Sequence, residues 1–305
     1  MLTIISAPSN LGLRPPEPGS VPGTAKAPDA LREAGLYRRL VASGARDSGV
    51  VLAGRYRDDL DPQRSRLRNQ EAIVDHARRL SERVGACIDR DEKVLILGGD
   101  CSLLVGIGLA LSQRGRFGLI HLDGHTDFRH PGNSHECGSL GGEDLAAVVG
   151  RHWDSVADID EHRPYFRTED TAHLGSRSDD EHLEEVGDAL AFVMPAEAIR
   201  SSGPPRVAAQ VLAALPLDLL DGYWIHLDVD ILDPSIMPAV DSPADNGLSA
   251  EDLLALLAPL VPGAVGLDIT IYDPDLDPEG TYARLLTELA TEALSPFAHN
   301  DCARQ

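Results

Sequence analysis

The chain has 305 residues, and its 49 acidic and 27 basic side chains give a formal net charge of −22 at pH 7. This negative balance argues against nucleic-acid binding, because phosphates require a basic surface. Hydrophobic residues make up 43 % of the chain, but no long apolar run occurs, which argues against a membrane span. We therefore expect a globular protein that binds neither nucleic acid nor membrane.

The N-terminal segment and the cysteines indicate the compartment. The segment MLTIISAPSN lacks the basic region and the cleavage site of a signal peptide. Four cysteines at irregular spacing, Cys87, Cys101, Cys137 and Cys302, do not form the pattern of a disulfide framework. We expect a cytoplasmic protein with reduced thiols.

Short apolar runs rich in β-branched residues predict strands, and helical patterns lie between them. Strands are expected at 2–6, 49–53, 93–97, 117–122, 172–175, 190–194, 223–228 and 264–270. Helices are expected at 28–42, 66–90, 103–114, 142–150, 179–187, 205–214, 249–258 and 281–294. Such alternation predicts an α/β fold with a parallel sheet covered by helices on both faces. No low-complexity linker divides the chain, so we expect one domain over residues 1–305.

One loop in this pattern is long and rich in proline and glycine. It spans residues 9–28 and is too long for a simple turn. Loops of this length at the edge of an α/β sheet often help to wall a ligand site. We expect the same of this loop.

The segment HLDGHTDF, residues 121–128, brings charged side chains onto one side of the chain. In a strand, residues two apart point the same way, so Asp123, His125 and Asp127 share one face. Buried charges in proteins are paired or coordinate a metal. The preceding apolar strand places this triad at a carboxyl end, and we expect it to bind a metal ion.

Three further segments end strands in the same way. They are GGDCS (98–102), HLDVDILDP (226–234) and VGLDITIYDP (265–274). Ligands of open α/β sheets bind outside the carboxyl ends of the strands, so these clusters should converge on one site. Asp228 and Asp230 join Asp123 and Asp127 there, and four carboxylates would be too negative to persist without about two divalent cations.

The motifs GGDCS, DGHTD and HLDVDILDP together resemble the three signature motifs of the ureohydrolase family, which includes arginases, agmatinases and formimidoylglutamases. Residues 22–36 are also similar to an early segment of that family. The resemblance implies a three-layer α/β/α fold around an eight-stranded parallel sheet. It also implies hydrolysis of an amidino or imino C–N bond of a small molecule by two Mn²⁺ ions bridged by hydroxide. Relatives are commonly trimers or hexamers, so a homo-oligomer is expected.

The resemblance also implies roles for individual residues. Asp123 and Asp228 would bridge the two ions, and Asp127 would also orient the hydroxide as the catalytic carboxylate. Ser139 and Asp180 fall in segments that would contact the substrate. One ion would be held by Cys101, Asp123, Asp127 and Asp228, and the other by Asp123, His125, Asp228 and Asp230. A thiolate at Cys101 would also admit other divalent metals.

The chain departs from the family pattern at three positions. Cys101 replaces a histidine ligand, and Gly141 stands where a proton-shuttle histidine is expected. Ile271 stands where a glutamate pairs with the guanidinium, and an unpaired cation in a closed site costs several kcal/mol. We therefore expect a substrate other than plain arginine. His135, Glu136 and Glu143 are nearby residues that could supply a proton relay or a cation contact.

Two other functions stay open at this point. One is a deacetylase-like amidohydrolase that uses a single metal, and the other is a non-catalytic relative that binds metal for stability or regulation. The presence of both Asp228 and Asp230 beside a complete Asp-x-His-x-Asp favours two metals. The sequence therefore favours a dinuclear hydrolase.

Overall fold

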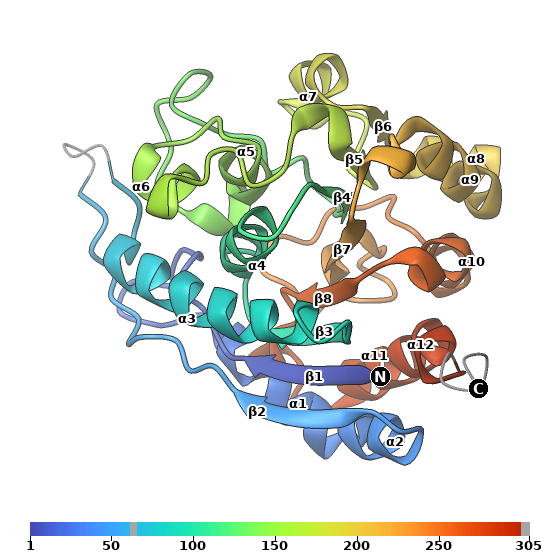
Figure 1. The fold of residues 1–305 in the computed structure, drawn as a ribbon. Helices are drawn as coiled ribbons and strands as arrows, with labels where there is room; N and C mark the ends of the chain where they lie inside the picture. Colours follow the sequence, from blue (N-terminus) through green and yellow to red (C-terminus); the bar gives the residue numbers. More distant parts are fainter. Residues whose placement is uncertain (62–65, 300–305) are drawn as a thin grey trace.

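Eight strands form one sheet in a computed structural model that describes residues 1–61 and 66–299. The strand order is β2-β1-β3-β8-β7-β4-β5-β6, and all neighbouring strands run parallel (Figure 1). The strands are β1 Leu2–Ala7, β2 Arg46–Val50, β3 Lys93–Gly98, β4 Phe117–Leu122, β5 Thr171–Leu174, β6 Phe192–Met194, β7 Gly222–Asp228 and β8 Gly266–Thr270.

Helices cover both faces of the sheet, which confirms the predicted three-layer α/β/α class. On one face, the core contains side chains of α3 to α6; on the other, it contains side chains of α1, α2 and α8 to α11 (Figure 1). The helices are α1 Ala27–Glu33, α2 Leu36–Ala42, α3 Gln70–Ile88, α4 Leu103–Ser112, α5 Asp144–Val148, α6 Asp154–Ala157, α7 Leu183–Ala189, α8 Ala196–Ser202, α9 Pro204–Ala214, α10 Ala250–Leu260, α11 Thr281–Ala293 and α12 Ser295–His299.

The strands read as unbroken apolar runs because both of their faces are buried. In β1, Ile4 packs into one core and Ile5 into the other, and Leu95 and Ile96 of β3 divide in the same way. Successive side chains of a strand point to opposite faces, so each strand contributes to both cores. The central strands are thereby fixed firmly enough to carry a site at their ends.

Several predicted elements differ from the structure in their bounds, and in three of them the cause is visible. The helix expected at 28–42 is split at Gly35, whose φ of 95° is left-handed and therefore ends a right-handed helix. The helix expected at 66–90 begins only at Gln70, after Asn69 with a φ of 54°. The strand expected at 49–53 lies at Arg46–Val50. It is an exposed strand at the edge of the sheet, so hydrophobic residues do not mark its bounds.

Two further observations bear on the sequence predictions. No helix within residues 1–61 and 66–299 is long and apolar enough to cross a membrane. Cys87, Cys101 and Cys137, the cysteines in this part of the chain, are free thiols.

Candidate metal centre

The predicted metal ligands come together at the carboxyl ends of β3, β4 and β7. His125, Asp127, Asp228 and Asp230 line a cavity of about 750 Å³. Cys101 is fully buried and its Sγ lies 2.9 Å from Asp228 Oδ2. The candidate ligand atoms of Asp123, His125 and Asp230 all lie within 4.8 Å of one another.

Backbone amide groups orient these carboxylates. Asp123 Oδ1 accepts a hydrogen bond from His125 N at 2.7 Å, and Asp228 Oδ1 accepts one from Asp230 N at 2.8 Å. Asp230 Oδ1 accepts one from Gly124 N at 2.9 Å. A Cβ on Gly124 would lie only 2.6 Å from Asp230 O, so this close approach requires glycine. In each of these carboxylates, Oδ1 accepts a hydrogen bond from a nearby backbone amide, and Oδ2 faces the cluster.

The electrostatics of the cluster call for a cation. Burial, followed by neighbouring carboxylates, raises the pKa of Asp123, Asp127 and Asp228 well above the ordinary range. Asp123 Oδ2 is buried and has no hydrogen-bond partner within the described residues. Oxygen-rich ligands with one imidazole suit Mn²⁺ or a similar divalent ion, so the residues present fit the metal that the resemblance implies.

His125 and Asp230 form an ion pair within this cluster. His125 Nδ1 lies 2.9 Å from Asp230 Oδ2. The carboxylate raises the pKa of His125 despite partial burial. Burial opposes ionisation of Asp230, but His125 outweighs it and holds the pKa of Asp230 below its usual value. A bound cation would take the place of the proton on His125.

Cys101 is a protonated thiol in the absence of metal. Burial raises the pKa of its thiol, and the Asp228 carboxylate raises it further. The sulfur donates to Asp228 Oδ2 and lies 3.1 Å from Thr270 Oγ1, a contact that the sequence did not predict. The thiol would lose its proton only to a metal, because a coordinating thiol is deprotonated outright.

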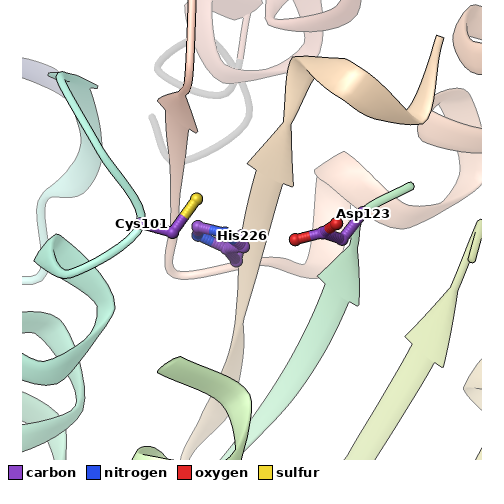
Figure 2. Close-up of side chains that lie close together, drawn as sticks. All are labelled: Cys101, Asp123 and His226. Atoms are coloured by element: carbon purple, nitrogen blue, oxygen red, sulfur yellow. The ribbon is translucent and has the colours of Figure 1, made fainter. Parts of the chain in front are cut away.

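Sequence reasoning missed two histidines and one aspartate beside the cluster. Figure 2 shows His226 on β7 between Cys101 and Asp123, and candidate ligand atoms of these three residues lie within 4.8 Å of one another. His226 precedes Asp228 by two residues, as His121 precedes Asp123, so each histidine shares a strand face with its aspartate. That spacing was the available signal. Asp144, the first residue of α5, carried no such signal.

The two predicted substrate-binding residues both line the cavity. Ser139 Oγ accepts a hydrogen bond from Arg68 Nη1 at 2.6 Å, which fixes its position. The Asp180 carboxylate accepts hydrogen bonds from Thr126 N at 3.0 Å and Thr126 Oγ1 at 2.6 Å. Asp180 therefore positions the segment that carries His125 and Asp127, in addition to facing the cavity.

Two of the three positions that depart from the family pattern line the cavity. Gly141 and Ile271 are both part of its wall. Ile271 has a φ of 72°, which is strained for a β-branched residue, and its N–H donates to Gly99 O at 2.7 Å. The turn after β8 therefore holds an apolar side chain at the place expected for a cation-binding glutamate.

The three residues proposed as substitutes for the missing groups do not line the cavity. Glu143 is fully buried, where it accepts hydrogen bonds from the Gly138 and Ser139 amides and contacts His152 Nε2 at 2.8 Å. Its carboxylate is committed to the loop backbone, so that prediction was wrong for Glu143. His135 and Glu136 are exposed.

The long loop near the N-terminus walls the cavity, as predicted. Residues 12–16 and Pro22 line it. Asp100, in the GGDCS segment, accepts hydrogen bonds from Ser9 Oγ at 2.7 Å and Gly12 N at 3.2 Å. The turn that carries Cys101 is thereby tied to the loop.

Comparison with known proteins places this geometry in a family. The family model described as "Arginase family" matches residues 3–295. The chain belongs to the arginase family. It is 29 % identical to an arginase from Bacillus caldovelox over 255 residues, which cover 81 % of this chain and 82 % of that one. It is 25 % identical to an arginase from Bacillus subtilis (strain 168) over 302 residues, covering 96 % and 97 %.

Solved structures of the family share the fold. The native arginase structure from Bacillus caldovelox at pH 5.6 superposes with a TM-score of 0.85 at 26 % identity, covering 96 % of this chain and 97 % of that one. Proclavaminate amidino hydrolase from Streptomyces clavuligerus superposes with a TM-score of 0.70 at 20 % identity, covering 97 % and 91 %. The resemblance seen in the three motifs therefore extends over nearly the whole chain.

Proposed function

We propose that this arginase-family chain is a metal-dependent hydrolase that cleaves a C–N bond of a small guanidino or amidino compound other than plain arginine. The observation that carries this proposal is the convergence of four carboxylates, one imidazole and one thiol at a cavity large enough for such a substrate. The proposal includes a homo-oligomer, trimer or hexamer, which rests on the family resemblance. It also includes a cytoplasmic location, which rests on the cysteine pattern of the sequence.

Two divalent ions, Mn²⁺ in the first instance, would share the cluster. Bound there, they would lower the pKa of water toward neutrality and stabilise the charge of a tetrahedral centre. Asp123 and Asp228 would contact both ions, consistent with the unpartnered Asp123 Oδ2. Cys101 and Asp127 would complete one ligand set, and His125 and Asp230 the other.

Asp127 would act as the catalytic carboxylate. Its side chain lines the cavity, so it can hold and orient the attacking water. In the metal-free protein, burial and then the Asp144 carboxylate raise its pKa. With the ions bound, the Asp127 carboxylate would be ionised and could accept a hydrogen bond from this water.

Asp241 would pair with the cationic group of the substrate in place of a residue at position 271. Asp241 lines the cavity, and its one hydrogen-bond contact within the described residues is Ser242 Oγ at 3.4 Å. The other carboxylates of the walls are engaged: Asp180 by Thr126, Glu181 by Arg129, and Asp273 by the amides of Gly23 and Asp275.

The backbone brings Asp241 to the same side of the cavity as Ile271. Asp273 N donates to Ala239 O at 2.9 Å, so the segment 239–242 runs beside the turn after β8. A free carboxylate next to an apolar residue can neutralise a guanidinium that Ile271 cannot. Asp241 and Ile271 together thus support a guanidino substrate whose cation pairs with Asp241 and not with a glutamate at position 271.

A product screen with metal counting tests the proposed function. Mn²⁺-loaded protein would be incubated with a library of guanidino and amidino compounds, and urea, ammonia, acid and hydroxyurea would be measured. We expect two ions per chain and turnover of a compound other than arginine. One ion with amide hydrolysis would indicate a single-metal amidohydrolase, and two ions without any turnover would indicate a non-catalytic relative. Cobalt-loaded wild type and Cys101→Ser compared by absorption spectroscopy would test the thiolate ligand.

A further inference from the structure

A second group of metal-binding atoms lies outside the predicted ligand set. Three buried polar atoms without a hydrogen-bond partner within the described residues lie together: His121 Nε2, His226 Nε2 and Asp144 Oδ2. The candidate ligand atoms of His121, Asp144 and His226 all lie within 4.8 Å of one another. Unpaired buried polar groups are costly, and a group of three in one place points to an occupant.

The Nδ1 atoms of His121 and His226 contact neighbouring side chains, and this leaves the Nε2 atom of each ring facing the group. His226 Nδ1 lies 2.6 Å from Asp268 Oδ2, and His121 Nδ1 lies 3.0 Å from His173 Nδ1. These residues form one row across β5, β4, β7 and β8, because their positions are paired in the sheet register. A histidine whose Nδ1–H donates to a carboxylate while Nε2 stays free is the arrangement found in metal-binding histidines.

The distances from Asp144 Oδ2 to the two histidine nitrogens match a metal better than a water molecule. Asp144 Oδ2 lies 3.7 Å from His121 Nε2 and 3.8 Å from His226 Nε2. Metal–ligand bonds of about 2.0–2.2 Å place tetrahedral ligands about 3.3–3.6 Å apart. A tetrahedrally bonded water would place its partners about 4.6 Å apart.

We propose that His121, His226 and Asp144 bind a transition-metal ion of the Zn²⁺ class, in addition to the ions of the predicted centre. Two imidazoles and one carboxylate suit Zn²⁺. His121, Asp144 and His226 do not line the cavity, so the ion has no open position for substrate. It serves structure: it ties the first residue of α5 to β4 and β7.

The site is tested in a variant that lacks the predicted centre. Asp228→Asn/Asp230→Asn removes two carboxylates that belong only to that centre. After zinc loading and dialysis, we expect about one Zn²⁺ per chain by mass spectrometry, with two imidazoles in the X-ray absorption spectrum. His125 alone would supply one imidazole. The proposal would be overturned if the variant bound no zinc, which would mean that a buried water or a protonated histidine occupies the site. It would also be overturned if the zinc had fewer than two imidazole ligands.

Adding His121→Asn to this variant should weaken zinc binding by more than about 100-fold, because loss of an outer partner alone costs about 10–100-fold. His76→Asn is the matched control: it replaces another buried histidine, on α3, whose Nε2 contacts Val51 O. If the double variant does not fold, the wild type and His121→Asn are compared after zinc loading: one ion per chain fewer in His121→Asn is expected, and equal ion counts would contradict the site. None of these measurements uses turnover, so they are independent of the proposed reaction.

Discussion

The six predicted metal ligands, four of which line the cavity, form a floor at the strand ends, whereas the walls of the cavity are loops. In the floor, backbone amides fix the Asp123, Asp228 and Asp230 carboxylates at 2.7–2.9 Å. The walls comprise residues 12–16, 139–142, 180–182, 240–242 and parts of 271–276. The family pattern is retained in the floor except at Cys101 and is broken in the walls at Gly141 and Ile271. We therefore expect the floor to carry the chemistry shared with the family and the walls to determine the choice of substrate.

The largest expected effect comes from breaking the floor. Asp228→Ala should remove most bound metal and abolish hydrolysis, with a loss well above the roughly 10–100-fold that removal of an outer-shell partner costs. The variant also leaves the Cys101 thiol without its 2.9 Å acceptor. Metal content by mass spectrometry and kcat/KM on the best substrate measure both effects. Asp228→Ala protein that still holds two Mn²⁺ would contradict the ligand assignment.

Removing the metal should make stability depend on pH. In metal-free protein, the pKa values of Asp123, Asp127 and Asp228 are raised, and that of Asp144 is raised to about 7. The folded state then binds more protons than the unfolded state, so stability falls as pH rises.

The histidines near the floor define the useful pH window. Burial lowers the pKa of His121 and His173, which favours folding as pH rises toward their unfolded pKa of about 6.5. Above pH 6.5 this opposing effect is complete, so stability of metal-free protein should fall between pH 6.5 and 8. The loss is about 1.4 kcal/mol per pH unit for each extra proton retained. Urea unfolding with and without Mn²⁺ measures it, and a pH-independent metal-free protein would contradict the raised pKa values.

The sequence predicted the floor well because an apolar run marks where each strand ends. Asp123, His125 and Asp127 follow the end of β4 at Leu122, but they lie in a turn, where Asp127 has a φ of 45°, and not on one face of a strand. The period of two within the strands themselves would have found His121 and His226. The walls have no period, so Asp241 was not found. The contacts of Glu143 depend on the folded loop, which no local pattern predicts.

Within the walls, Asp241→Asn should raise KM for a cationic guanidino substrate by about 10–100-fold, because a charge-assisted hydrogen bond is lost. The bound metal and kcat should change little. Asp245→Asn is the matched control, since it removes the same charge from the same loop at a residue that does not line the cavity. Adding Ile271→Glu to Asp241→Asn should restore part of the affinity. Equal KM values for Asp241→Asn and Asp245→Asn would remove Asp241 from the substrate site.

The smallest expected effect lies at the cavity mouth, where Arg14 is exposed on the N-terminal loop. Within the described residues no carboxylate pairs with Arg14, whereas Arg129, which also lines the cavity, is paired with Glu181 at 2.6 Å. A free guanidinium at this position can bind a carboxylate at the distal end of a substrate. Because an exposed ion pair contributes about 0.2–1 kcal/mol, Arg14→Ala should raise KM up to about fivefold for substrates with a carboxylate and leave their decarboxylated counterparts unchanged. Competition by arginine and by agmatine in the two proteins measures this difference, with Arg38→Ala on α2, outside the cavity lining, as control. If Arg14→Ala weakens the binding of arginine and agmatine equally, Arg14 shapes the loop and does not bind the substrate carboxylate.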